Sequence, residues 1–258
     1  MAAPAKIDPM HQFQIAPVGG GELTGSPFMF TNSALWMMVV LGVVLVFMWG
    51  GMRRQLVPGR WQSAVEMLTG FLDNITRQNI GPEGRRYLPW VFTAFVFILA
   101  ANWVSALPLA IVGPHPFSVT AQFTVTGVLS VVSFAIVLAV GFWKHGLHFF
   151  SLFVPHGTPL PMIPVIFPIE LVSFLVRPFS LGLRLFVAMT AGHVLLKVLA
   201  GFVINSSNAG VGYGLTIGSA SFILMIGISA LEVLVAVIQA YVFALLTSVY
   251  LNDAENLH

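Results

Sequence analysis

The sequence predicts an all-α polytopic membrane protein: about five crossings, an amphipathic interfacial helix, and a long tilted helical hairpin at the end. Composition supports this fold class, because 57% of the 258 residues are hydrophobic and only 8% are charged. Soluble domains usually carry about 25% charged residues, so this chain has too little polar surface to cover a water-soluble globule. It has no cysteine, which excludes disulfide bonds, thiolate metal sites and a catalytic thiol.

The first part of the chain alternates between polar and apolar segments. Residues 1–28 are polar and interrupted by prolines, so we expect an extra-membrane arm there. Residues 29–52 are apolar, uncharged and long enough for a first span. Residues 58–86 hold most of the charged side chains, and their apolar residues recur at intervals of three and four. This pattern predicts an amphipathic helix along the interface, which Gly81-Pro82 should end.

Residues 87–157 are expected to contain the second and third spans and a polar link. The second span covers residues 87–112 and the third covers residues 119–143. A polar cluster of one lysine and three histidines follows: Lys144, His145, His148 and His156.

Residues 158–252 are predicted to form the final hairpin. Its two apolar stretches, residues 169–204 and 211–251, are joined by a turn signal at 205–210. Both exceed the roughly 20 residues that a perpendicular span needs. We therefore expect them to be tilted, kinked or partly interfacial, with Pro178 and Gly182 as candidate kink sites.

Basic residues near the predicted span ends indicate how the chain is oriented across the membrane. They occur after the first span, along the interfacial segment and after the third span: Arg53, Arg54, Arg60, Arg77, Arg85, Arg86 and Lys144. The links at 113–118 and 205–210 contain neither lysine nor arginine. We therefore expect the N-terminus outside and the C-terminus in the cytoplasm.

One arginine, Arg184, lies inside an apolar run of the hairpin, where a charge costs about 3 kcal/mol on insertion scales. In the returning stretch, Glu232 and Gln239 are seven residues apart and so share a helix face, roughly 10 Å apart. Folding the hairpin about a turn near Gly210 gives two polar levels. The pair of Arg184 and Gln239 lies deep in the membrane, and the pair of His193 and Glu232 lies nearer the outer side.

Each of these side chains also has a purely structural interpretation. Arg184 could snorkel to the cytoplasmic face, although Arg177 already serves that end two turns away. His193 could simply donate to a backbone carbonyl, and Glu232 could be a protonated, hydrogen-bonded carboxylic acid in the core. Glu170 could merely pair with Arg177.

Several motifs of the hairpin resemble the signature of subunit a of the F-type ATP synthase. They are Ser-Leu-Gly-Leu-Arg-Leu-Phe at 180–186 with Ala-Gly-His at 191–193, Pro-Ile-Glu at 168–170, Arg177-Pro178, and Leu231-Glu232 through Gln-Ala-Tyr-Val-Phe at 239–243. Residues 8–13 look like the N-terminal arm of alphaproteobacterial members. The resemblance covers most of the chain and is most specific in the hairpin.

This resemblance implies a proton-translocating stator subunit that holds two offset half-channels against a rotating ring of subunit c. By position, Arg184 resembles the essential arginine that separates the half-channels, and Gln239 the glutamine close to it. His193 and Glu232 occupy inlet positions where many bacterial members have Glu and His in the opposite order. Ala188 departs from the family, since many members carry Asn there.

The outlet would run to the cytoplasmic side past Glu170 and Ser173. Implied partners are the membrane carboxylate of the subunit c ring, subunit b or b/b′ of the peripheral stalk, the rest of the ATP synthase, and membrane lipid. The resemblance implies location in the bacterial inner membrane, with no catalytic site of the chain's own, no cofactor or metal, and no nucleic acid.

Two other functional classes fit an apolar chain with a deep arginine. One is a proton-coupled secondary transporter in which Arg184 holds an anionic substrate. Such transporters often have related halves, and the sequence shows no repeat of that kind. The other is a structural or assembly protein of the membrane.

Overall fold

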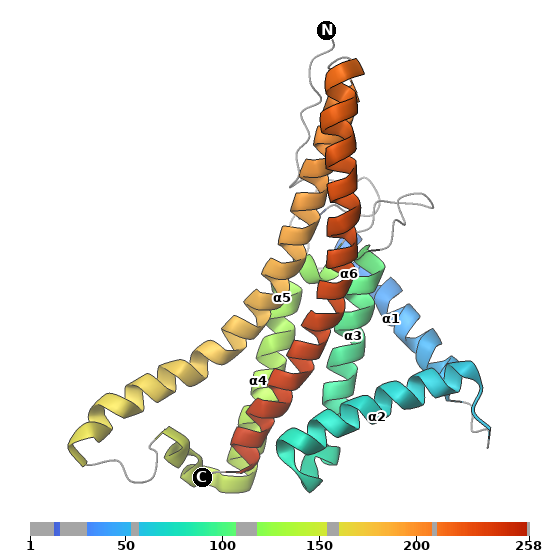
Figure 1. Cartoon of the computed structure of the whole chain (residues 1–258). Coiled ribbons are helices and arrows are strands. Elements are labelled where there is room, and N and C mark those ends of the chain that lie inside the picture. The colour runs from blue at the N-terminus through green and yellow to red at the C-terminus, as the bar shows by residue number, and fades with distance from the viewer. Residues whose placement is uncertain are drawn as a thin grey trace. The chain divides into compact units, whose positions relative to one another are not determined.

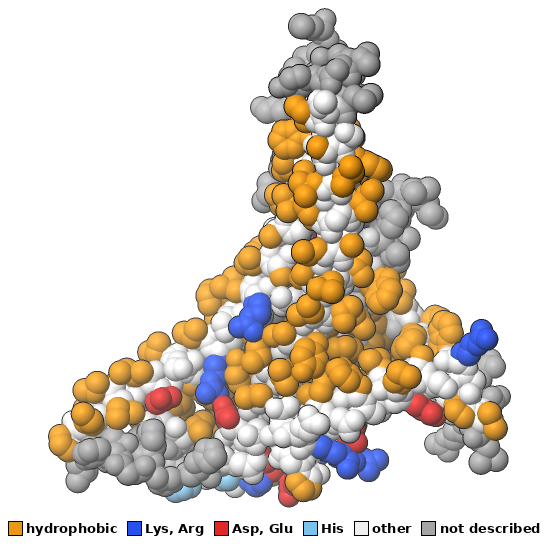
Figure 2. Space-filling model, in the orientation of Figure 1, with side chains coloured by type: hydrophobic (Ala, Val, Ile, Leu, Met, Phe, Trp, Pro, Cys, Tyr) orange, Lys and Arg blue, Asp and Glu red, His pale blue; other side chains and the backbone are white. Residues whose placement is uncertain are grey.

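The computed structural model describes residues 13–15, 30–52, 57–106, 118–153, 160–207 and 211–256. These residues form six α-helices joined by short 3₁₀ helices (Figure 1). Five of the six are long and apolar enough to cross a membrane. Hydrophobic side chains cover most of the visible helical face in Figure 2. The predicted fold class is confirmed.

The first two helices follow the predicted boundaries closely. Helix α1 runs over Asn32–Gly51, inside the expected first span. Helix α2 runs over Arg60–Ile80 and is amphipathic, with Val65, Leu72 and Ile75 on its buried side. Gly81 ends it with a φ of +94°, a conformation that glycine adopts without steric cost. The 3₁₀ helix η2, Pro82–Arg86, follows.

The second and third predicted spans correspond to α3, Leu88–Ala106, and α4, Phe123–His145. The end expected for the second span, up to residue 112, lies outside the described residues. The short 3₁₀ helix η4, Val119–Ala121, occupies the start expected for the third span, so α4 begins later. Further 3₁₀ helices, η5 over Gly146–Phe153 and η6 over Leu160–Met162, precede the hairpin.

The hairpin helices are longer than predicted. Helix α5 covers Ile163–Ser207 and α6 covers Val211–Glu255, with 45 residues each. At 1.5 Å per residue each is about 68 Å long, more than twice the roughly 30 Å hydrocarbon core. Helix α5 continues through Pro168 and Pro178 without a break, because the loss of one backbone hydrogen bond at each proline does not outweigh the bonds on either side.

The contacts divide the chain into two compact units. Unit 1 comprises residues 1–43, 98–122 and 186–239, and unit 2 comprises residues 44–97, 123–185 and 240–258. Both hairpin helices belong partly to each unit, with the boundary between Leu185 and Phe186 in α5 and between Gln239 and Ala240 in α6. Arg184 thus belongs to unit 2 and Gln239 to unit 1, and their predicted pairing stays a prediction.

Within unit 2, Gly182 allows α5 to pack closely on α4. A Cβ at this position would lie 2.8 Å from Ser130 Oγ and 3.2 Å from the backbone oxygen of Thr126. The hydroxyl of Ser130 bonds within its own helix, to the Gly127 carbonyl at 2.8 Å. Small residues of this kind let spanning helices approach each other.

We expect Gly182→Val to weaken the α4–α5 contact by about 1–3 kcal/mol, the usual cost of overpacking. Gly42→Val in α1 is the matched control, since a Cβ there has no atom within 4 Å. The measurement is the thermal midpoint of the purified complex, together with the amount of chain in the membrane. Equal midpoints for the two variants would contradict close packing at Gly182.

Candidate functional site

A buried pair of ionisable side chains joins α5 to α6 in unit 1. His193 Nδ1 lies 3.1 Å from Glu232 Oε1, and the two side chains are only 13% and 7% exposed. The atoms are within ion-pair distance, but their orientation does not form a hydrogen bond, since Glu232 Oε1 has no such partner among the described residues. The structure therefore places His193 and Glu232 at one level, as the hairpin geometry predicts.

Gly192 makes room for this carboxylate. A Cβ at position 192 would lie 3.0 Å from Glu232 Oε1 and 3.4 Å from Glu232 Cδ. A side chain at this position would need Glu232 to shift by a few tenths of an ångström. The Ala-Gly-His sequence at 191–193 thus has a direct packing role.

Several other polar atoms of unit 1 are buried without a hydrogen-bond partner in the described part of the chain. They include His193 Nε2, Thr190 Oγ1 one helical turn before it, and Asn102 Oδ1. An unpaired polar atom in an apolar interior is costly, and bound water is its usual partner. The arrangement therefore suits a small hydrated path between helices.

Asn102 is the residue of this site that the sequence did not assign. It is fully buried in α3, and its Nδ2 donates to the backbone oxygen of Ala236 at 3.1 Å. Ala236 lies one helical turn beyond Glu232 in α6. A lone asparagine in the middle of an apolar span was the available signal, since polar groups in spans usually bond across helices.

In unit 2, Arg177 is held by a carboxylate and two aromatic rings. Its Nη1 lies 2.6 Å from Asp253 Oδ2, and its Cζ lies 5.4 Å and 5.2 Å from the ring centres of Phe174 and Tyr250. The suggested pairing of Arg177 with Glu170 is therefore wrong. Glu170 is two turns away along the same helix, whereas Asp253 approaches from the returning helix.

Arg184 is exposed on α5 and has a different environment. The ion pairs among the described residues of unit 2 are Asp73–Arg77, Lys144–Glu255 and Arg177–Asp253. None of them involves Arg184. An exposed guanidinium on a spanning helix, with no carboxylate of its own unit in ion-pair distance, is suited to meet a carboxylate from another chain.

The remaining predicted site residues are not brought together by any contact. Glu170 is half-buried and Ser173 exposed near the start of α5 in unit 2, whereas Gln239 and Ala188 are half-buried in unit 1. Within the described ranges, no group of three metal-ligating side chains comes together.

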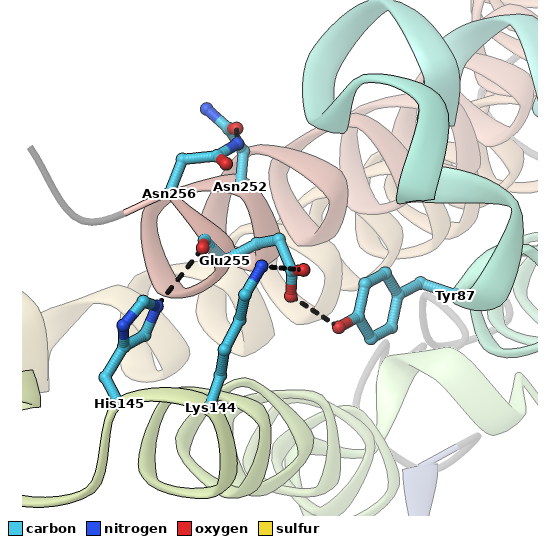
Figure 3. A network of polar contacts seen from close by, with 6 residues as sticks. All are labelled: Tyr87, Lys144, His145, Asn252, Glu255 and Asn256. Atoms are coloured by element: carbon cyan, nitrogen blue, oxygen red, sulfur yellow. Dashed lines mark hydrogen bonds and ion pairs between the residues drawn. The ribbon is translucent and has the colours of Figure 1, made fainter.

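A second polar network lies where α4 and α6 end in unit 2 (Figure 3). The buried Glu255 accepts from Lys144 Nζ at 2.5 Å and from the Tyr87 hydroxyl at 2.6 Å, and His145 Nε2 lies 3.2 Å from its backbone oxygen. Burial, followed by the hydrogen bond to Glu255, raises the pKa of Tyr87 to about 12. Tyr87 therefore stays a protonated donor at physiological pH.

This network accounts for part of the predicted polar cluster. Lys144 and His145 both contact Glu255, whereas His148 is exposed and His156 lies outside the described residues. The cluster thus fastens the end of α6 to α4.

Comparison with known proteins supplies the family. The family model described as ATP synthase A chain matches residues 34–252. The chain is 68% identical to ATP synthase subunit a of Sphingopyxis alaskensis, over 100% of this chain and 99% of that one. It is 54% identical to ATP synthase subunit a of Zymomonas mobilis subsp. mobilis over 100% of both chains, and 45% identical to that of Rhodospirillum rubrum over 97% of this chain and 99% of the other. The resemblance in the hairpin motifs is confirmed, and the chain belongs to the ATP synthase subunit a family, as a multi-pass component of the proton-translocating membrane sector rather than a catalytic subunit.

Proposed function

We propose that the chain is the stator through which protons pass between two offset half-channels and a rotating ring of subunit c, with Arg184 separating the half-channels. The observation that carries the proposal is the 3.1 Å contact between His193 and Glu232, buried between two spanning helices. Ionisable groups at membrane depth are costly and usually mark ion pathways.

The inlet half-channel runs from the outer side past His193 and Glu232. An imidazole can accept a proton at one nitrogen and release it from the other, and a neighbouring carboxylate can take it up. Two buried atoms without a hydrogen-bond partner belong to Thr190, one turn before His193 on α5, and to Asn102, which bonds to Ala236 one turn after Glu232 on α6. They are suited to hold water that hands protons to the His193–Glu232 pair.

Arg184 acts on the carboxylate that each ring subunit carries. That carboxylate crosses lipid in its protonated form, because desolvation disfavours the charged form. Opposite Arg184 the deprotonated form is favoured, since an ion pair at 4 Å gains about 4 kcal/mol at an effective dielectric of 20. Arginine effectively never loses its own proton, so it blocks direct proton passage between the half-channels.

The outlet half-channel runs to the cytoplasmic side past Glu170 and Ser173, and Gln239 is a further polar group of the proposed proton path. Each proton that crosses the membrane supplies about 2.3 kcal/mol per 100 mV, which drives the ring. Ala188 leaves the turn after Arg184 without the asparagine of many relatives, which removes one polar group from the proposed path.

The partners follow from the same proposal. They are the ring of subunit c, subunit b or b/b′ of the peripheral stalk, and membrane lipid. The distribution of arginine and lysine supports an N-terminus outside the bacterial inner membrane and a C-terminus in the cytoplasm.

The two half-channels can be tested by thiol accessibility, because the chain has no cysteine of its own. Thr190→Cys should react with a small membrane-impermeant thiol reagent from the outer side only. Ser173→Cys should react from the cytoplasmic side only. Labelling of this chain in right-side-out and inside-out vesicles, read by mass spectrometry, is the measurement.

Val131→Cys is the matched control, because Val131 is 60% exposed on the apolar surface of α4 and should react from neither side. Reaction of both test positions from the same side would refute two offset half-channels.

A further inference from the structure

A cleft in unit 2 is not used by the proton path. It lies between η2, α4 and the end of α6 and has a volume of about 460 Å³. Ile136, Val140 and Trp143 of α4 form its apolar wall, and the polar rim includes Glu83, Arg86, Lys144 and Glu255. The cleft therefore combines an apolar side with charges of both signs.

The rim charges are not equally available to a ligand. Lys144 and Glu255 form an ion pair with each other. Arg86 is exposed, and among the described residues no carboxylate lies within ion-pair distance of it. Glu83 is exposed and lies close to the Lys144–Glu255 pair. A ligand would meet an unpaired cation at Arg86 and an acidic position at Glu83.

The apolar wall of the cleft, formed by Ile136, Val140 and Trp143, indicates a ligand that lies in the membrane. Trp143 is 93% exposed at the end of a spanning helix, the level at which tryptophan borders the polar headgroups. Val140 and Ile136 continue along α4 from there toward the apolar interior. A soluble metabolite would leave this wall uncovered.

A phospholipid suits this cleft, because it needs enclosure only at its headgroup and upper chain, and the rest of its chains lie in the bilayer.

We propose that this cleft binds a phospholipid with a phosphoethanolamine headgroup, its phosphate at Arg86, its ammonium at Glu83 and one acyl chain along Val140 and Ile136. The guanidinium fork binds phosphate oxygens in two parallel hydrogen bonds. The ammonium group of the headgroup is a donor that a carboxylate accepts. The site is independent of the proposed proton path.

The test counts lipids on the purified complex by native mass spectrometry. After removal of loosely held lipid by detergent, phosphatidylethanolamine or phosphatidylglycerol is added at defined concentrations. We expect Arg86→Gln to weaken binding of one phosphatidylethanolamine molecule about tenfold. Arg85→Gln is the matched control, since it removes the same charge one residue away from a side chain that does not line the cleft.

Glu83→Gln should abolish the preference for phosphatidylethanolamine over phosphatidylglycerol, because only the former carries the ammonium group. Equal loss in the Arg86 and Arg85 variants, or equal binding of both lipids by the unmodified complex, would overturn the proposal. So would a photoreactive residue at position 143 that crosslinks to another subunit instead of to lipid.

Discussion

Arg184→Ala is expected to abolish ATP synthesis driven by a proton gradient while the complex still assembles and leaks protons. The reason is that alanine removes the cation that favours a charged ring carboxylate. A loss of about 4 kcal/mol corresponds to roughly a thousandfold reduction in coupled rate. The measurements are the rate of ATP synthesis in energised vesicles and the proton permeability of vesicles stripped of the catalytic sector.

Assembly should survive because Arg184 makes no ion pair within the described residues of its own unit.

The variant Arg184→Lys tests whether a positive charge at this position is enough, or whether the charge must also be permanent. Lysine restores the positive charge but can lose its proton in a buried site, so we expect incomplete recovery and a residual leak. Unchanged synthesis in the alanine variant would remove Arg184 from its proposed role.

Arg177→Gln is the matched control on the same helix. It removes a cation seven residues earlier, but one that is paired with Asp253 and packed between Phe174 and Tyr250. We expect this variant to lower the thermal stability of the complex without a proton leak. A leak of equal size in both variants would show that any lost cation opens the path.

The sequence predicted the pairing level of His193 and Glu232 because helix geometry is regular. A turn signal and a constant rise per residue place two positions opposite each other without knowledge of side-chain packing. The same argument could not find Asn102, because its partner is a backbone carbonyl of Ala236, which no residue pattern distinguishes. The same geometry pairs Arg184 with Gln239, and this pairing stays a prediction, since the two residues belong to different units.

The polar network at the end of α6 was missed for a different reason. The predicted stretch stopped at Leu251, because Asn252, Asp253 and Glu255 are polar. The helix continues to Glu255, where Asp253 and Glu255 pair with basic residues of α5 and α4. Hydropathy marks the end of the apolar surface and not the end of the helix, which continues through these paired polar residues.

Glu232→Gln should slow proton uptake from the outer side and reduce ATP synthesis about 10- to 100-fold without a leak. Glutamine keeps the volume of the side chain beside Gly192, so packing is preserved, but it cannot take up or release a proton. Positioned acid–base groups commonly contribute factors of 10² or more to a rate. The measurement is the initial rate of synthesis at a series of outer pH values.

The exchange of an acid into position 193 distinguishes a proton relay from a structural contact. In the double variant His193→Glu with Glu232→Gln, the site again holds one carboxyl group within about 3 Å of the partner position. A relay needs a titratable group in the path but not at a fixed position, so we expect this variant to recover part of the lost rate. A structural contact would instead be damaged twice, because both original side chains are gone. The single variant His193→Gln is the remaining comparison. If the double variant synthesises ATP no faster than either single variant, the pair serves to hold the helices together and protons take another route.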